Sequence, residues 1–253
     1  MTLSREQVAS YRDNGFVSGI RVMSAAQAAA FAEEIERYLD AGIARHGALW
    51  RPGQLDPNAD AAHPLSEAFD RLGQWPAMLD AVESLLGGNL LIRNADVFVK
   101  EPGRWEDGID WHLDTAATSR DTAAMLSVFI ALTETTARNG CIEFSAGTHR
   151  RIVDDPPPDK YHLTLSKRAA KSLKRRDTVA CPLQPGEISI HHIRTAHRSH
   201  WNRHQARRIG FVIRFLTPAV SNGTAESGIA TLVRGEAPGQ RYMLRPRFPV
   251  SWT

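Results

Sequence analysis

From residue 89 onward, this chain is a succession of short apolar runs separated by turn residues. The runs are rich in Val, Ile, Leu and Phe and are shorter than typical helices, which is the pattern of β-strands. Because most of them follow one another without a long helix between, the sequence predicts an antiparallel sandwich or barrel and not a parallel α/β sheet. We expect a mainly β protein with peripheral helices, specifically a jelly roll, whose open end lets side chains from distant strands converge. The expected strands cover 90–100, 124–132, 141–144, 178–183, 188–192 and 209–215.

The residues before this strand-rich part predict helices packed against it. Ser4 with Gln7, and Ser24 with Gln27, both fit the Ser-x-x-Gln capping box that marks a helix start. Two shorter helices and one short strand are also expected, at 64–72, 76–86 and 15–17.

Length and composition predict one soluble domain. A chain of 253 residues, 42% of them hydrophobic, can bury a single sizeable core. No run approaches the roughly 18 apolar residues of a membrane span, and the start lacks the apolar segment of a secretory signal, so we expect a cytoplasmic protein without membrane contact. Its expected parts are a helical part at 1–88, a jelly-roll core at 89–220 and a C-terminal extension at 221–253.

The net charge of +3 permits an anionic substrate but does not predict a nucleic-acid partner, because no nucleic-acid-binding module accompanies it. Basic residues are concentrated in 167–176. That run is either the solvated face of a helix or a lid or docking surface for an anionic or carrier-bound substrate. Cys141 and Cys181 are expected to be reduced, as is usual in the cytosol. None of these features predicts an oligomeric state.

Two histidines and an aspartate form a candidate metal site. His112 and Asp114 are two residues apart, so on a strand they share a face. With His197 from a later strand they would complete the two-histidine, one-carboxylate triad that holds non-haem Fe(II) and leaves positions open for oxygen chemistry. Zinc, which also binds His and carboxylate, is the alternative.

Arg208 adds context that a zinc site would not explain. It enters the strand expected at 209–215, and its planar guanidinium could pair with the far carboxylate of a dicarboxylate co-substrate. By alternation Arg214 shares its face, whereas Arg207 points the other way and is expected to be solvated.

Together these motifs resemble the phytanoyl-CoA dioxygenase family. The resemblance covers most of the chain, because an N-terminal pattern ending in Gly15-Phe16-Val17 is also typical of the family. It is carried by His112-x-Asp114, Asn139-Gly140-Cys141, Ala146-Gly147-Thr148-His149, Gly186-Glu187, His197-x-Ser199-x-x-Asn202 and Arg208. Ala146-Gly147-Thr148-His149 stands where relatives usually have Pro-Gly-Ser-His, and the segment Ser189-Ile190-His191 is unusually polar.

The resemblance implies a double-stranded β-helix that uses Fe(II), 2-oxoglutarate and O2. It makes His112, Asp114 and His197 the iron ligands and the catalytic centre. Of the histidines crowded into 191–204, it selects His197 by its spacing to the residues that follow. It further implies that the 2-oxoglutarate site contains Arg208, Ser199 and Lys100.

The family pattern also bears on the reaction. Relatives that halogenate have a small residue at the position of Asp114, so the carboxylate here favours hydroxylation or a related oxidation, with release of succinate and CO2. The alternative is a non-catalytic or differently metallated member of the fold that binds a ligand.

Four residues are candidates for contact with a small-molecule substrate. Asn94, Asp96 and Phe98 share a strand face with Lys100, and Trp111 flanks His112. The alternatives are that Asn94 and Asp96 face solvent on an edge strand and that Trp111 packs in the core.

Overall fold

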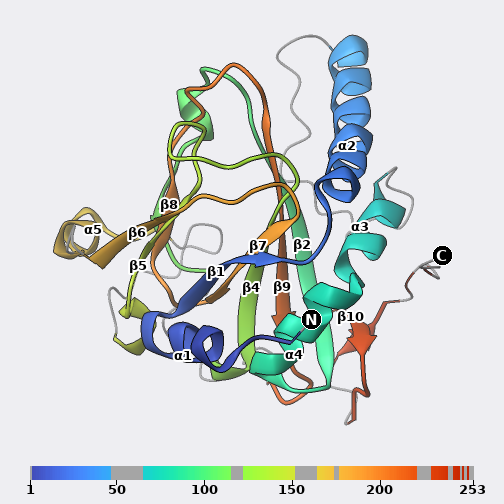
Figure 1. Cartoon of the computed structure of the whole chain (residues 1–253), viewed down its shortest axis with the longest axis vertical. Coiled ribbons are helices and arrows are strands. Elements are labelled where there is room, and N and C mark those ends of the chain that lie inside the picture. The colour runs from blue at the N-terminus through green and yellow to red at the C-terminus, as the bar shows by residue number, and fades with distance from the viewer. Residues whose placement is uncertain are drawn as a thin grey trace.

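The computed structural model describes the chain in several stretches. They are residues 2–46, 65–114, 122–151, 164–173, 177–220, 229–238 and 242–245, together with 247 and 250. Within them the strands form two sheets, and three of the helices run along the outer side of the larger sheet (Figure 1).

The described helices are short except for one. They are α1 (Arg5–Asn14), α2 (Ala25–His46), α3 (Ser66–Gly73), α4 (Pro76–Leu86) and α5 (Lys167–Ser172), with the 3-10 turns η1 (Trp105–Asp107), η2 (Thr122–Ala124) and η3 (Thr148–Arg150). The capping box of α1 is present: the Gln7 backbone N–H donates to Ser4 Oγ, and the Gln7 side chain accepts from the Ser4 backbone. Ser24 and Gln27 make the same pair at the start of α2.

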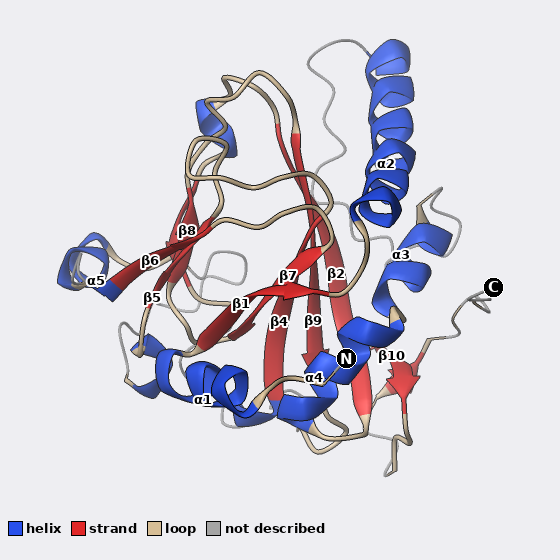
Figure 2. Ribbon diagram, viewed as in Figure 1, coloured by secondary structure: helices blue, strands red, loops and turns tan. Residues whose placement is uncertain are grey.

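The larger sheet has the order β1-β7-β4-β9-β2-β10-β11, and the smaller one the order β3-β8-β5-β6. All described pairings are antiparallel except that of β10 with β11. Figure 2 shows the two sheets as separate layers. The larger sheet contains β1 (Phe16–Arg21), β2 (Leu90–Lys100), β4 (Met125–Ala131), β7 (Glu187–His192), β9 (Arg208–Leu216), β10 (Ile229–Arg234) and β11 (Met243–Leu244). The smaller sheet contains β3 (Ile109–His112), β5 (Ile142–Ser145), β6 (Thr178–Cys181) and β8 (His197–Ser199). This is the jelly roll that the sequence predicts.

Strand β4 shows how alternation divides the molecule into layers. Leu126, Val128 and Ile130 belong to the cluster that packs the larger sheet against α2, α3 and α4. Phe129, on the opposite face, joins Phe144 of the smaller sheet in a second cluster between the sheets. A sheet covered on both faces in this way needs few polar positions, and those it has on the inner face are therefore candidates for function.

Strands from both flanking parts of the chain join the larger sheet. Strand β1, which overlaps the short strand expected at 15–17, pairs with β7. Strand β10, from the expected C-terminal extension, pairs with β2. Both therefore extend the larger sheet. Cys141 and Cys181 are free and buried, as expected, and burial raises the pKa of Cys181 to about 11.

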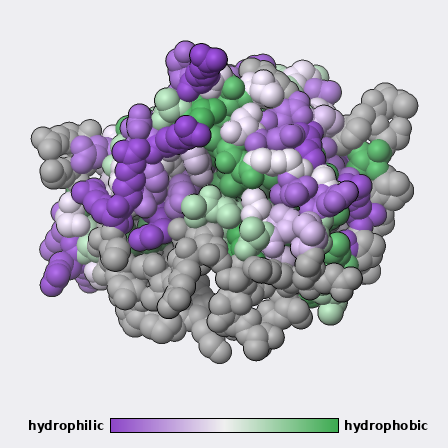
Figure 3. All heavy atoms as spheres, turned by 90° about the horizontal axis from the view of Figure 1, so that it is seen from below, coloured by the Kyte–Doolittle hydropathy of each residue, from purple (hydrophilic) through white to green (hydrophobic). Residues whose placement is uncertain are grey.

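On the face shown in Figure 3, hydrophilic side chains predominate, with a narrow band of hydrophobic ones between them. Among described residues the exposed large hydrophobic side chains are Trp105, Val179, Ile229, Met243 and Leu244, the last three of which lie on the paired strands β10 and β11. None of the described helices combines the length and apolarity that crossing a bilayer requires.

Candidate metal centre

Three side chains converge between the two sheets at the positions that the sequence predicts. His112 ends β3 and His197 begins β8, and the two residues are cross-strand partners. Asp114 follows two residues after His112, and its backbone N–H donates to the Ile193 carbonyl at 2.9 Å. One ligand atom from each of the three lies within 4.8 Å of the others. Asp114 Oδ1 is 4.0 Å from His112 Nε2 and 3.9 Å from His197 Nε2.

Both imidazoles are oriented so that Nε2 is available as a ligand atom. His112 Nδ1 lies 2.9 Å from the Asp110 carbonyl, and His197 Nδ1 lies 2.9 Å from the Thr195 carbonyl. A carbonyl can only accept, so each Nδ1 donates and each Nε2 carries the lone pair. Burial lowers the pKa of both histidines, that of His197 strongly, which keeps the rings neutral as metal binding requires.

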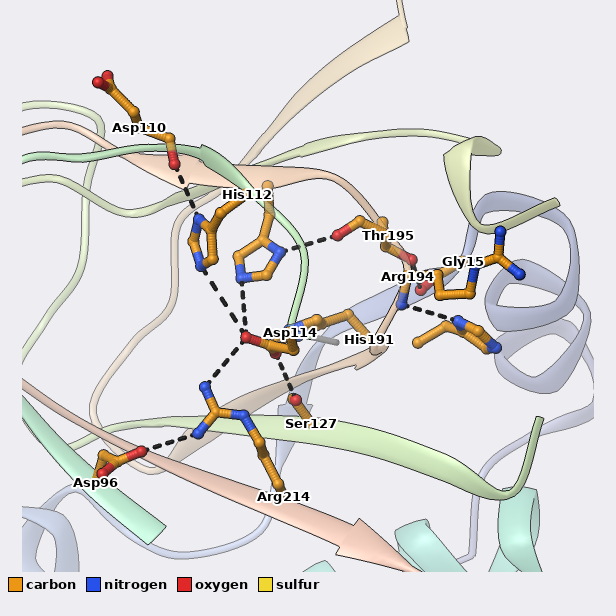
Figure 4. A network of polar contacts seen from close by, with 12 residues as sticks. Gly15, Asp96, Asp110, His112, Asp114, Ser127, His191, Arg194, Thr195 and Arg214 are labelled. Atoms are coloured by element: carbon orange, nitrogen blue, oxygen red, sulfur yellow. Dashed lines mark hydrogen bonds and ion pairs between the residues drawn. The ribbon is translucent and has the colours of Figure 1, made fainter. Parts of the chain in front are cut away.

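The Asp114 carboxylate is held by three side chains of the larger sheet (Figure 4). Ser127 Oγ donates to Oδ2 at 2.6 Å, and His191 Nε2 donates to the same oxygen at 2.9 Å. Arg214 Nη2 donates to Oδ1 at 3.1 Å. Burial acts to raise the pKa of Asp114, but Arg214, His197 and His191 together outweigh it and hold that pKa well below its usual value. The carboxylate is therefore ionised and ready to ligate a cation.

This donor set fits Fe(II). Two neutral imidazoles and one carboxylate are the ligands of the facial triad, which leaves the remaining metal positions open. The converging but unbonded nitrogen and oxygen atoms, 3.9–4.0 Å apart, leave space for an ion between them.

Arg208 lies on the same cavity and has unused hydrogen-bond donors. Its Nη2 donates to the Gly140 carbonyl at 2.7 Å, while its buried Nε and Nη1 have no hydrogen-bond partner among the described residues. Burial without a carboxylate partner lowers the pKa of Arg208 to about 10. A buried guanidinium with free donors is costly unless an anion from outside the chain satisfies it, and a ligand carboxylate would do so.

The cavity that connects Arg208 with the triad has an empty volume of about 440 Å³, its open mouth included. Some of the described side chains that line it are apolar, and others are polar. The apolar side chains are Phe98, Ile109, Phe129, Ile142 and Val212. The polar ones are His112, Asp114, His191, His197, Arg198, Ser199, Arg208 and Arg214.

Comparison with known proteins identifies the family. Residues 11–210, well over half of the chain, match the family model described as phytanoyl-CoA dioxygenase (PhyH). The chain belongs to the phytanoyl-CoA dioxygenase family.

Two relatives of this PhyH chain are named as dioxygenases. It is 28% identical over 179 residues to the ectoine dioxygenase of Bordetella parapertussis, which is 66% of this chain but only 57% of that protein. It is 23% identical over 249 residues to a probable alpha-ketoglutarate-dependent hypophosphite dioxygenase of Stutzerimonas stutzeri, covering 92% of this chain and 86% of that protein.

Solved structures agree with the fold. The apo form of ThoJ, described as a non-heme monooxygenase, has a TM-score of 0.78 at 29% identity and covers 95% of this chain and 88% of its own. The nickel complex of ThoJ has a TM-score of 0.75 at 30% identity, covering 97% of this chain and 89% of its own.

The two other residues expected at the co-substrate site of this PhyH protein lie in different surroundings. Ser199 lies on the wall of the cavity. Lys100 is the cross-strand partner of Arg208 but is not among the cavity-lining residues. Its Nζ donates to the backbone carbonyls of Asp107 and Ser199, and so ties η1 to β8 beside the cavity.

The residues expected to contact substrate are only partly brought together. Phe98 lines the cavity. Asp96 is buried, but it accepts from Arg214 at 2.8 Å and from Asn94 at 3.0 Å, so it supports the cavity wall rather than facing solvent. Among described residues Trp111 does not line the cavity. It packs with Leu113 under α5, because alternation turns it away from the face of its neighbour His112.

In the basic run at 167–176, charged and apolar side chains lie on different sides of the helix. Lys167, Arg168 and Lys171 of α5 are exposed, while Ala169 of the same helix packs on Trp111. The described part of the run therefore lies on the outer side of the smaller sheet, as expected for a solvated helix face. Residues 174–176 lie outside the described residues.

Sequence reasoning missed some of the polar contacts of this site. It did not find Ser127 or the contact of His191 with Asp114. Arg207, expected to be solvated, is paired with Glu101 at 3.0 Å and with Asp40 at 2.7 Å. The signal that could have found Ser127 is its position as a lone hydroxyl in the otherwise apolar run 125–131.

Proposed function

We propose that this protein is an Fe(II)- and 2-oxoglutarate-dependent dioxygenase that hydroxylates a C–H bond of a small molecule. The observation that carries the proposal is a shared cavity with two features. One is a triad of donors suited to iron, and the other is a buried arginine with unsatisfied donors. A dicarboxylate that chelates the metal at one end and meets Arg208 at the other would satisfy both.

The chain's own residues would divide the work of binding. His112, Asp114 and His197 would hold iron through Nε2, Oδ1 and Nε2. Arg208 would fix the far carboxylate of 2-oxoglutarate, with the Ser199 side chain beside it on the cavity wall. Bound iron supplies the activation of O2, and 2-oxoglutarate supplies electrons and leaves as succinate and CO2.

The protein would contribute position and exclusion of water. The apolar wall formed by Phe98, Phe129, Ile142 and Val212 lowers the local polarity, which strengthens the pairing of Arg208 with a carboxylate. A substrate held with one C–H bond toward the open metal positions would be oxidised there, so its placement decides which carbon reacts. Because Asp114 supplies a ligand where halogenating relatives have a small residue, we propose hydroxylation over halogenation.

The substrate is proposed to be a small molecule, as the names of the ectoine and hypophosphite dioxygenases suggest for those relatives. An anionic or carrier-bound form is the finer proposal, and the net charge of +3 permits it. We also propose a cytoplasmic location, which cell fractionation would test.

The test is a screen for succinate release with iron, 2-oxoglutarate and candidate substrates, followed by mass analysis of each substrate that stimulates release. A gain of one oxygen atom in the product supports hydroxylation. The alternative, a ligand-binding or differently metallated member of the fold, predicts that no substrate stimulates succinate release even when iron is bound.

A further inference from the structure

Three polar side chains form one row on the inner face of the larger sheet. In the strand register, Ser127 of β4 is the partner of Arg214 of β9 on one side and of His191 of β7 on the other. Ser127 and His191 are buried and Arg214 is largely so. Partners in register lie close enough for their side chains to reach a common point. That common point is the carboxylate of Asp114 (Figure 4).

The three side chains of this row make different hydrogen bonds to the two oxygens of Asp114. Oδ2 accepts from Ser127 at 2.6 Å and from His191 at 2.9 Å. Oδ1, the oxygen that lies between the two ligand imidazoles, accepts only from Arg214 within the described residues, at 3.1 Å. Ser127 and His191 therefore occupy the oxygen that faces away from the metal position and present Oδ1 to it.

His191 and Arg214 are themselves held in place by further contacts. His191 packs against the rings of Phe144 and His197, with centroids 5.0 and 4.5 Å apart. Its Nε2 must carry a proton, because a carboxylate oxygen only accepts, and Nδ1 is buried without a hydrogen-bond partner among the described residues. Arg214 is anchored by Asp96 at 2.8 Å. A buried nitrogen without a hydrogen-bond partner raises the free energy of the folded state. That cost indicates that the contact with Asp114 fixes the ring.

The position of Asp114 in the chain explains why such support is needed. Strand β3 ends at His112, so no described strand pairing fixes the residue that carries the carboxylate. Its backbone makes one described hydrogen bond, to Ile193.

We propose that Ser127, His191 and Arg214 are positioning residues that hold the Asp114 carboxylate with Oδ1 toward the metal. This inference rests on the proposed function, since it assigns the support of the same metal centre. Hydrogen-bond partners of metal ligands typically change metal affinity by about 10- to 100-fold when removed.

The experiment compares Ser127→Ala and His191→Phe with a matched control, Ser189→Ala. Ser189 is a buried serine of β7, two residues from His191, and its Oγ has no hydrogen-bond partner. The Phe ring keeps the packing of His191 and removes its donor. Ni(II) alone is titrated into the metal-free protein, and the melting temperature is recorded with and without Ni(II).

We expect Ser127→Ala and His191→Phe each to bind Ni(II) at least tenfold more weakly than the wild type, and Ser189→Ala to bind it as the wild type does. Ser127→Thr, which keeps the hydroxyl, should restore most of the affinity. A purely structural role would lower the melting temperature of the metal-free protein but leave the Ni(II)-induced increase unchanged.

The outcomes separate the two proposals. A wild type that does not bind Ni(II) contradicts the proposed metal centre itself. A wild type that binds Ni(II), together with Ser127→Ala and His191→Phe variants of equal affinity, overturns the positioning role and leaves the proposed function standing.

Discussion

Replacing Arg208 with alanine should weaken 2-oxoglutarate binding far more than metal binding. The guanidinium is buried, and in the part of the chain that the structure describes only its Nη2 makes a hydrogen bond, to the Gly140 carbonyl at 2.7 Å. Loss of a buried, hydrogen-bonded charge pair costs about 2–5 kcal/mol. At about 1.4 kcal/mol per tenfold change, this predicts a dissociation constant for 2-oxoglutarate that rises on the order of 100-fold.

The assay is titration of 2-oxoglutarate into the Fe(II)-loaded protein under anaerobic conditions, with bound iron quantified in every variant. Arg208→Lys should recover only part of the affinity, because an ammonium cannot reproduce the paired donors of the guanidinium. Arg207→Ala is the matched control. Arg207 pairs with Glu101 and Asp40 instead of lining the cavity, so its loss should leave 2-oxoglutarate affinity unchanged.

The result that would refute this reasoning is specific. Suppose that Arg208→Ala bound 2-oxoglutarate as the wild type does, while Arg214→Ala lost that binding with its iron retained. Arg214, and not Arg208, would then be the residue of β9 that binds the far carboxylate.

Three further predictions concern the metal, stability and pH. Alanine at any one of the three proposed metal ligands should abolish substrate-dependent succinate formation while circular dichroism stays unchanged; full activity would remove that residue from the triad. Arg214→Met should lower the free energy of unfolding by about 3–5 kcal/mol, because it removes the cation that pairs with the buried Asp96 carboxylate; urea denaturation at neutral pH would show this, and an unchanged midpoint would contradict it. Burial, helped by Arg208, lowers the pKa of Lys100 from 10.5 to about 7. The unfolded chain then binds the extra proton between these values, so stability should rise as the pH increases from about 7 toward 10.5. Lys100→Met should flatten that rise, and an equally steep rise in both proteins would refute the assignment.

The sequence predicted the parts of the fold that depend on local pattern. The 76–86 helix and the 90–100 strand have the expected bounds, because a proline start, a Gly-Gly stop and β-branched runs act locally. The additions of β1 and β10 to the larger sheet were not predicted. Which strands pair at the edges of a sheet depends on long-range contacts that a single strand's composition does not encode.

The same distinction applies to the site. His112 and Asp114 could be assigned to one face because they are two residues apart, and the same alternation turns Trp111 away from the cavity, which the sequence reasoning did not use. The contacts of Ser127 with Asp114 depend on lateral register among β9, β4 and β7. That register brings together residues far apart in the chain, and no local pattern reveals it.

The most direct test of the central claim is an anaerobic titration of the metal-free protein with Fe(II) and then 2-oxoglutarate, followed by visible absorption. Chelation of iron by 2-oxoglutarate produces a weak metal-to-ligand charge-transfer band, which we expect in the wild type and not in Asp114→Ala. An iron-loaded wild type that shows no such band on addition of 2-oxoglutarate would contradict the account.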